Sequence, residues 1–318
     1  MSTRSSGTPQ LSVVTPVFNC LAYSKEMVES LRATLPRDMA HEIILVDDGS
    51  TDGTREWLSG LGDPFRVILN ERNVGFGAAT NRGAAQARGS ILALLNNDLV
   101  LERGWLGPML GALERLGTRA GLVGNIQFSA GSRELDHAGI RITLKGKPEH
   151  DRRPPALASL ALRPVRRAVA VTGACILVRS DTWNRLGGFD EAYFNGCEDV
   201  DLCLRARKAG LINCVALRSR VLHHVSSSPG RKRRDEENTR ILVLRWRREL
   251  AELGSREWTA EHFGRLVQDP RDFPDALEAW RMVLFMARVR GTPPATSLAG
   301  MNAAIDRELA RWREMSSD

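Results

Sequence analysis

The 318-residue chain lacks the features that mark membrane-spanning and secreted proteins. No apolar run approaches the ~20 residues that a helix needs to cross a bilayer. The first residues, Met1–Gln10, are polar and contain no apolar signal segment. We therefore expect a cytosolic protein with a loose, disordered tail over residues 1–10.

Two sequence motifs of well-known protein classes are also missing. The five cysteines include no C-x-x-C pair, and their scattered spacing is typical of reduced thiols that fill a core. The same spacing argues against a zinc site. No G-x-G-x-x-G follows the first apolar run, which disfavours a Rossmann-type dehydrogenase.

Positive charge is in excess, with a formal net charge of +7 and basic clusters at 152–153, 163–167 and Arg231–Arg234. Aromatic residues are not interleaved with these clusters as stacking platforms, so a nucleic-acid partner is disfavoured. The first two clusters are interpreted as solvated surface. For Arg231–Arg234 a solvated face, an anionic membrane surface and an anionic substrate all stay open.

The N-terminal part alternates β-branched apolar runs with helical patterns, which predicts a mostly parallel, doubly wound α/β sheet. Ser24 is the expected N-cap of the first helix, and residues 50–52 are the expected cap of the second. The expected strands are 11–19, 43–47, 67–70 and 90–96, and the expected helices are 24–35, a short one around residues 57–58, and 76–88.

The pattern changes after residue 125. We expect an irregular excursion over 126–170 with short strands such as 139–143, and then a long buried strand over 169–178. A helix over 199–209 should end at Gly210, and short strands should follow. From Asp235 onward the pattern is helical.

Two apolar runs end abruptly in polar residues, at Asp47-Asp48-Gly49-Ser50 and at Asn96-Asn97-Asp98. Ligands of open α/β sheets bind outside such strand ends. The first run offers carboxylates for a base or ribose, and the second offers hard oxygens that suit Mg²⁺ or Mn²⁺. Ordinary polar turns are the alternative interpretation of each run taken alone.

A third segment, Gly187–Leu202, combines paired glycines and two aromatics with the acids Glu198 and Asp199 at a helix start. Acids in a first helical turn stabilise the helix by ~0.3–1 kcal/mol each, but that gain does not explain the loop before them. An ionised carboxylate there is what a general base requires. The pair His223-His224 follows a strand and fits either a surface pair or ligands.

In this order the motifs resemble family 2 glycosyltransferases with the GT-A fold. The resemblance covers roughly residues 11–250, and the nearest subgroup is that of bacterial rhamnosyltransferase-like enzymes that build surface polysaccharides. The segments that carry it are 13–19, 46–52, 72–83, 94–98 and 187–205.

The resemblance implies four segments: the tail over 1–10, a nucleotide-sugar-binding half over 11–125, an acceptor-binding and catalytic half over 126–230, and a helical extension over 231–318. The implied donor-binding residues are Pro16, Phe18 and Asn19 at the base, Asp47 and Asp48 at the uracil or thymine edge, Asn73, Asn81 and Asn97 near the ribose or base, and Gly173 and Ala174 beneath the sugar.

The resemblance also implies the catalytic groups. Asp199 matches the catalytic base, and Glu198 orients the acceptor or the base. Asp98 and His223 match the ligands of a divalent cation, Mg²⁺ or Mn²⁺, that bridges the donor diphosphate. Asn96 replaces an acid common in the family, so the cation should be held firmly only together with the donor. Thr80 replaces a basic residue, which puts a diphosphate contact there in doubt.

The expected activity is therefore inverting transfer of a sugar from a UDP- or dTDP-sugar to a hydroxyl of a glycan or lipid-linked glycan, in bacterial polysaccharide or cell-wall synthesis. Peripheral contact with the inner face of the membrane and a homodimer stay open. A metal-dependent nucleotidyltransferase is disfavoured because a phosphate acceptor needs no base. A catalytically inactive basic binding module is disfavoured by Asp98 and Asp199.

Overall fold

The computed structural model describes residues 8–155, 164–224, 231–268 and 274–315, with only the backbone at 231–233. Most of the tail predicted over 1–10 and the side chains of Arg231–Arg233 thus lie outside the described residues. The chain forms two compact units. We call residues 1–140 and 150–235 the sheet unit, and residues 141–149 and 236–318 the helical unit. The division of the sheet unit at residue 125 stays a prediction.

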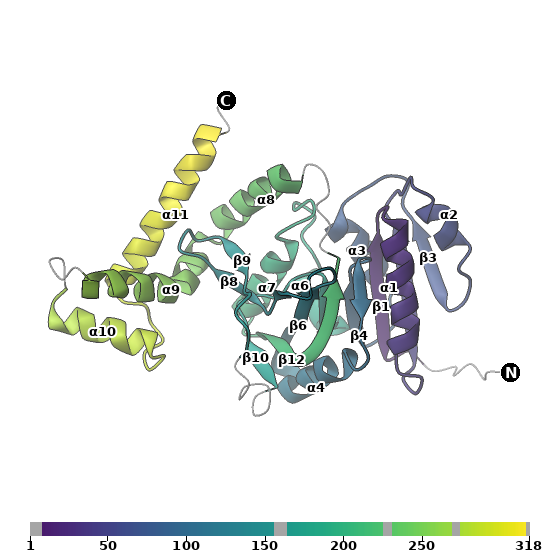
Figure 1. Cartoon of the computed structure of the whole chain (residues 1–318), viewed down its shortest axis with the longest axis horizontal. Helices are drawn as coiled ribbons and strands as arrows, with labels where there is room; N and C mark the ends of the chain where they lie inside the picture. Colours follow the sequence, from purple (N-terminus) through teal and green to yellow (C-terminus); the bar gives the residue numbers. More distant parts are fainter. Residues whose placement is uncertain (1–7, 156–163, 225–230, 269–273, 316–318) are drawn as a thin grey trace. The chain divides into compact units, whose positions relative to one another are not determined.

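The sheet unit contains a sheet of ten strands among its described residues (Figure 1). Eight of them lie in the order β10-β12-β6-β11-β4-β1-β2-β3, while β5 pairs with β12 and β7 with β6. Their bounds are β1 Leu11–Val17, β2 His41–Asp47, β3 Phe65–Leu69, β4 Ile91–Leu95, β5 Leu99–Leu101, β6 Ala120–Ser129, β7 Leu135–His137, β10 Val165–Arg167, β11 Cys175–Arg179 and β12 Ile212–His223.

Helices cover both faces of this sheet. Side chains of one face, such as Val13, pack with Leu31 and Met109 of the helices, whereas Gly83 lies directly against Val14 and Val46 of the other face. The helices are α1 Leu21–Thr34, α2 Thr54–Ser59, α3 Phe76–Ala84, α4 Leu106–Leu116, the short 3₁₀ helix η1 Gly117–Arg119, α6 Ser180–Leu186 and α7 Glu198–Lys208.

Burial on both faces explains why the central strands could be recognised as continuous apolar runs. Strands β3, β2, β1 and β4 are parallel to one another, whereas β11 runs antiparallel between β4 and β6. The predicted α/β class with helices on the sheet is confirmed. The sheet is mixed because β11, which lies in the middle of the strand order, runs antiparallel to both of its neighbours.

The predicted cap of the first helix is wrong. Helix α1 begins at Leu21, and Cys20 is its N-cap in a left-handed conformation with φ 59°. Ser24 is buried inside the helix and donates a hydrogen bond to the Cys20 carbonyl. Two successive residues of positive φ, Asn19 and Cys20, turn the chain directly from β1 into the helix.

The strand predicted over 169–178 is shorter than expected, because β11 begins only at Cys175. The amide N–H groups of Thr172 and Gly173 bond to side chains instead of a neighbouring strand. The strands expected over 213–217 and 219–223 are one strand, β12, with an irregular register between Ala216 and Arg220. Strands β6 and β7 occupy part of the stretch expected to be irregular.

The helical unit packs long helices against a hairpin turn. Lys147 of that turn forms ion pairs with Glu308, at 2.6 Å, and with Glu236, at 3.2 Å. Its elements are residues 141–149 of the hairpin β8 Ile140–Ile142 and β9 Pro148–His150, most of α8 Arg231–Arg245, and α9 Arg247–Gln268, α10 Ala276–Met286 and α11 Ala295–Met315. Within the described ranges, every helix is too short or too polar to span a membrane.

Gly300 of α11 lies directly against Trp258 of α9. A Cβ atom at Gly300 would overlap the ring of Trp258, whereas one at Gly264 of α9 would meet no atom within 4 Å. We predict that Gly300→Ala lowers the free energy of unfolding by about 1–3 kcal/mol through overpacking. The matched change Gly264→Ala should raise it by roughly 0.5–1 kcal/mol. Urea denaturation of both variants checks this, and equal stability would contradict the packing described.

Candidate functional site

The ends of β1, β2 and β4 bring the predicted donor-site residues to one edge of the sheet. Strand β1 pairs in parallel with both β2 and β4, so the carboxyl ends of all three strands lie at the same edge of the sheet. Asp47 is the last residue of β2, and Asp98 follows β4 by three positions. Two acid-tipped strands therefore meet where ligands bind in open α/β sheets.

Asp48 is buried and binds the loop over residues 70–75. Its Oδ1 accepts hydrogen bonds from Asn70 Nδ2, at 2.8 Å, and from Val74 N, at 3.0 Å, while Oδ2 accepts one from Gly75 N, at 3.0 Å. Burial raises the pKa of Asp48, against the lowering effect of these bonds. Since each carboxylate oxygen accepts about two bonds, Oδ2 is the atom with capacity left for a ligand.

Asp47 and Asn73 shape the turns around Asp48. Asp47 Oδ1 accepts from Ser50 N at 3.2 Å, and Arg55 lies 3.4 Å from Oδ2. Asn73 Oδ1 accepts from Gly75 N at 3.0 Å. A Cβ at Gly49, where φ is +80°, would lie 2.7 Å from the backbone of the 70–75 loop. The side chains of Asp47 and Asn73 thus stabilise the turns around Asp48 by accepting hydrogen bonds from main-chain N–H groups.

The residues predicted to line the nucleotide base differ in their exposure. Pro16 is buried in β1, whereas the Phe18 side chain is 44% exposed. Asn19 Oδ1 accepts from Thr51 N at 2.8 Å. Asn97 Nδ2 donates to Ser24 Oγ at 2.9 Å, which fixes the turn after β4 on helix α1. Phe18 therefore presents the open surface on which a base could stack.

Asp98 and His223 face each other. The β5–β12 ladder pairs His223 with Leu99, which sets the histidine beside Asp98. His223 Nε2 lies 3.1 Å from Asp98 Oδ1, but the two atoms are not aligned as a hydrogen bond. Asp98 Oδ1 is buried and accepts no hydrogen bond within the described part of the chain. A carboxylate oxygen and an imidazole nitrogen so placed fit a divalent cation.

His224 points elsewhere. Its Nε2 lies 2.9 Å from Glu26 Oε2, and its ring stacks on Tyr23 with centroids 4.5 Å apart. Of the two histidines, His223 is the one that faces Asp98.

A cluster that the sequence analysis missed lies behind His223. Asp136 Oδ2 is 3.9 Å from His223 Nδ1, and Arg152 is 3.0 Å from the other oxygen of Asp136. His150, 3.7 Å away, and then Arg152 hold the pKa of Asp136 well below its usual range. Metal-bound histidines commonly have a carboxylate on their second ring nitrogen. Asp136 lies on that side of the His223 ring, although at 3.9 Å the two form no hydrogen bond.

His137 completes this cluster as a neutral imidazole. It is fully buried, and burial keeps the pKa of its ring well below the ordinary value. Its Nε2 accepts a hydrogen bond from Thr172 N at 3.4 Å, and its ring contacts the edge of His150. The only sequence signal was an adjacent acid and histidine at 136–137 with a histidine at 150, in a stretch interpreted as irregular.

Asp199 lies in the first turn of α7, partly exposed. Its Oδ2 accepts from Gly173 N at 2.6 Å, and its Oδ1 from Val200 N at 2.7 Å. Burial raises the pKa of Asp199. Glu198 is buried, and its Oε2 accepts from Gly196 N at 2.6 Å. The predicted base thus adjoins the predicted sugar floor at Gly173, whose neighbour Ala174 is buried.

The loop before α7 is held by residues of two helices. Asn81 of α3 donates to the Phe189 carbonyl and to Glu191 Oε1, both at 2.9 Å, and accepts from Phe189 N. Arg205 of α7 donates to Asp201, at 2.7 Å, and to the Gly188 carbonyl, at 2.8 Å. The amide of Asn81, predicted near the ribose or base, is thus engaged with the 187–191 loop.

Thr80 also turns inward. Its hydroxyl is buried and donates to the Phe76 carbonyl at 2.7 Å within α3. It therefore gives a diphosphate no positive charge, in keeping with the doubt raised by the sequence.

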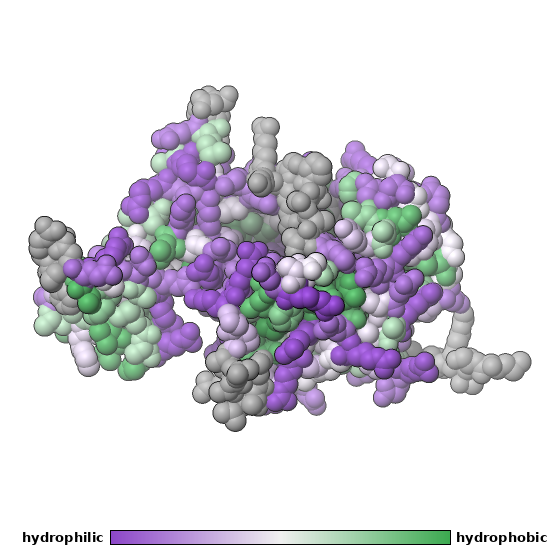
Figure 2. All heavy atoms as spheres, viewed as in Figure 1, coloured by the Kyte–Doolittle hydropathy of each residue, from purple (hydrophilic) through white to green (hydrophobic). Residues whose placement is uncertain are grey.

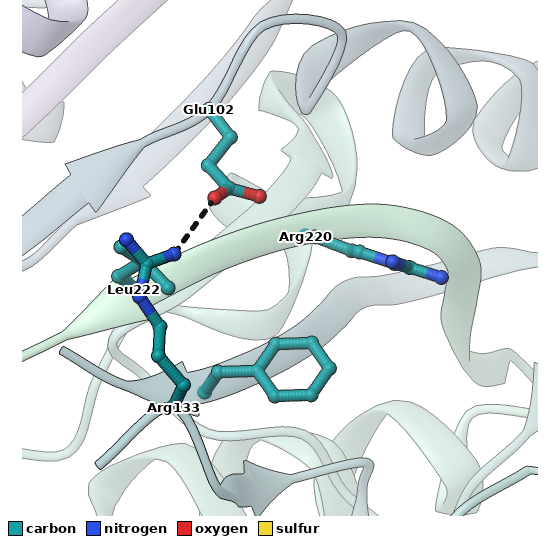
Figure 3. A pocket seen from close by; sticks show the side chains of 5 residues that line it. Glu102, Arg133, Arg220 and Leu222 are labelled. Atoms are coloured by element: carbon teal, nitrogen blue, oxygen red, sulfur yellow. Dashed lines mark hydrogen bonds and ion pairs between the residues drawn. The ribbon is translucent and has the colours of Figure 1, made fainter.

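A separate small pocket of about 190 Å³ lies on the β12 side of the sheet (Figure 3). Arg133 pairs with Glu102 at 3.4 Å across it. Leu222 lines the pocket while His223, the next residue of the strand, faces Asp98, as alternation along a strand requires. Its lining residues are Glu102, Phe128, Arg133, Arg220 and Leu222.

A mixed sheet with acids at two strand ends and a third acid at a helix tip defines a GT-A glycosyltransferase fold. The chain superimposes on GalNAc-T7, crystallised with UDP, GalNAc and Mn²⁺, with a TM-score of 0.60 and 18% identity, over 88% of this chain and 54% of that one. On S. aureus TarS 1-349 in complex with UDP-GlcNAc the TM-score is 0.55 at 15% identity, over 96% and 92%.

Residues 12–170 match the profile of Glycosyl transferase family 2. The chain is 32% identical to the uncharacterized protein y4gI of Sinorhizobium fredii, over 83% of this chain and 29% of that protein. It is also 32% identical to the O-antigen biosynthesis protein RfbC of Myxococcus xanthus, over 70% and 18%. The chain thus spans less than a third of these two relatives.

A third relative is of similar length. The N-acetylglucosaminyl-diphospho-decaprenol L-rhamnosyltransferase of Mycobacterium tuberculosis H37Rv is 31% identical, over 70% of this chain and 79% of that enzyme. The chain belongs to glycosyltransferase family 2, and the resemblance to its rhamnosyltransferase-like members is confirmed.

We predict that Asn81→Asp destabilises the 187–191 loop, because a carboxylate would face the Phe189 carbonyl and Glu191. The unpaired groups should cost about 1–3 kcal/mol in the free energy of unfolding. Adding Glu191→Gln should recover part of this loss, and urea denaturation of the double-mutant cycle measures the coupling. A variant that keeps wild-type stability but binds donor more weakly would instead favour the predicted ribose contact.

Proposed function

We propose that the chain is an inverting glycosyltransferase that moves a sugar from a UDP- or dTDP-sugar to a hydroxyl of a glycan or lipid-linked glycan. Membership of family 2 gives the reaction class. A relative named for transfer to a diphospho-decaprenol sugar supports a lipid-linked acceptor, and one named for O-antigen biosynthesis supports a role in surface polysaccharide synthesis.

The observation that carries the proposal is the setting of Asp199. Main-chain N–H groups of Gly173 and Val200 each bind one oxygen of its carboxylate, which fixes the side chain at the helix tip. A raised pKa brings a carboxylate closer to the pH at which a general base works best. Asp199 therefore takes the proton of the acceptor hydroxyl in a single displacement, a step that a nucleotidyltransferase would not need.

The donor's base end is assigned to Phe18 and Asp48, which follow β1 and β2 at the same edge of the sheet. Phe18 offers an exposed ring, and Asp48 Oδ2 offers a buried acceptor with capacity left after its bond to Gly75 N. A uracil or thymine presents one ring N–H donor that matches such an acceptor. Two solved neighbours hold UDP or a UDP-sugar in their crystals, which supports a uridine donor.

Asp98 and His223 are proposed to hold the divalent cation, Mg²⁺ or Mn²⁺. The unpaired oxygen of Asp98 beside His223 Nε2 fits such an ion. Within the described ranges no group of three or more acid, histidine or cysteine side chains is placed so that it could hold a metal ion by itself. Donor phosphates and water must therefore complete the shell. When bound, the cation neutralises charge that develops on the departing nucleoside diphosphate.

We predict that Asp199→Asn lowers kcat by about 10²–10⁴-fold, because the acceptor proton loses its base. Donor affinity, measured by calorimetry with UDP- and dTDP-sugars, should be unchanged. Asp181→Asn is the matched control: Asp181 also lies in a first helical turn, where it accepts from the next residue's N–H at 2.6 Å. That control should keep wild-type turnover.

The pH dependence provides the second readout for Asp199. A base works only when ionised, so kcat/KM should fall as the pH drops through the pKa of Asp199, which burial raises above the ordinary value of an aspartate. Normal turnover by a folded Asp199→Asn variant would overturn the assignment.

We predict that Mn²⁺ binding in the presence of UDP depends on Asp98 and His223. Asp98→Ala should abolish it and His223→Ala should weaken it, because each removes one ligand. Asp136→Asn should lower the affinity by about 10–100-fold by releasing the His223 ring. Paramagnetic resonance of Mn²⁺ measures binding without reference to activity.

His224→Ala is the control for this series, because His224 pairs with Glu26 rather than with Asp98. It should bind Mn²⁺ as the wild type does. Equal losses in His223→Ala and His224→Ala, or full activity of the wild type in EDTA, would remove the cation from the proposal.

A further inference from the structure

Helix α10 exposes an apolar face that no other described element covers. Leu277 is 59% exposed and Trp280 is 60% exposed. Three residues apart, they lie on one side of the helix, while Met282 and Phe285 are buried on the other side. Figure 2 shows green, hydrophobic surface over α10, at the lower left. A helix that is apolar on both sides requires a second apolar environment.

The chain after α10 folds back onto the end of this face. Val289 N and Arg290 N both donate to the Leu284 carbonyl, at 3.0 and 3.1 Å. Arg288 stands between them and the helix in the left-handed region, with φ 62°, where glycine is usual. The turn sets Val289, which is 74% exposed, at the helix end. A third exposed apolar side chain thus lies just beyond the last helical residue.

Positive charge surrounds the exposed apolar side chains. Arg288 and Arg290 are exposed and form no ion pair with any residue in the described ranges, and Arg281 follows Trp280 directly. The nearby acids are engaged within the unit: Asp275 caps α10 at Glu278 N, and Glu278 accepts from Thr296 and pairs with Arg281 at 3.4 Å. Among the described residues, the arginines of this region that lack an ion-pair partner are therefore Arg288 and Arg290.

We propose that this face, formed by Leu277, Trp280 and Val289 with Arg281, Arg288 and Arg290, binds the surface of an anionic phospholipid membrane. Leucine and tryptophan on one helix face, with arginines at its border, suit insertion at the level of the headgroups. The arginines attract anionic lipid, and their apolar stems lie along the inserted side chains. At about 16 Å, from 1.5 Å per residue, α10 lies on the bilayer rather than across it.

A second copy of the chain fits this face less well. A twofold dimer would bring the same patch of both copies together, and with it like-charged arginines, which repel. The proposal also differs from membrane contact through Arg231–Arg234, because it rests on α10 alone. It does not depend on the proposed reaction.

Flotation of the full chain with vesicles tests the proposal. Wild type should float with phosphatidylcholine vesicles that contain phosphatidylglycerol, and less with phosphatidylcholine alone or at high salt. Leu277→Ser with Trp280→Ser should lower the partition coefficient by about tenfold or more. Leu244→Ser, which changes a 55% exposed leucine on α8, is the matched control and should bind as wild type.

A second variant tests the charges without endangering the fold. Arg288→Gly gives the left-handed turn its preferred residue while removing a charge, and Arg290→Ser removes another. Together they should weaken binding about fivefold for each charge. Trp280→Phe should keep most of the binding yet lose the fluorescence quenching that brominated phospholipids cause in wild type.

The proposal is overturned if wild type ignores anionic vesicles, or if the Leu277→Ser, Trp280→Ser variant binds them as wild type does. It is also overturned if sedimentation shows a dimer that this variant converts to a monomer while vesicles bind neither form. In that case a second copy covers the face.

Discussion

Carboxylates that accept hydrogen bonds from main-chain N–H groups hold three segments of the candidate site. Asp48 binds the loop over 70–75, Asp199 binds Gly173 and its own helix tip, and Glu198 binds the turn at Gly196. Bonds to an ionised acceptor are stronger than neutral ones. Each acid is therefore already hydrogen-bonded to the backbone before a ligand binds. These bonds fix the shape of the loops at the edge of the sheet that the helices leave open.

The central strands could be predicted because burial on both faces makes them continuous apolar runs, as in the segment ending at Asp47. Element boundaries depended on interactions that the local sequence does not display. Helix α1 begins after two left-handed residues instead of at Ser24, and β11 begins late because Gly173 N bonds to Asp199. Strand β6 pairs with β11 and β12, which are distant in sequence, and β7 has only three residues, so no local period revealed them.

The residues of the candidate site also divide into those that could be predicted from the sequence and those that could not. Asp98 follows β4 and His223 ends β12, and such strand ends could be predicted from the sequence. Their side chains lie 3.1 Å apart, and their role as metal ligands stays a prediction. Asp136 and His150 come from three-residue strands in a polar stretch, and only the fold brings them behind His223. The sequence marked Asn81 as a candidate site residue, but it did not predict the partner of the side chain. The Asn81 amide donates to the carbonyl of Phe189, 108 positions away in the 187–191 loop.

The bonds between α3 and the segment before α7 have a consequence for the order of binding. Besides Asn81, the first residue of α3 takes part, because Phe76 N donates to Asn195 Oδ1 at 2.6 Å. The 70–75 loop leads directly into that helix start. A donor that orders this loop thereby reduces the conformational entropy that is lost when residues 187–195 become ordered. In the proposed reaction, the donor and the acceptor are therefore linked through one helix terminus, and a bound donor is expected to favour an ordered 187–195 segment.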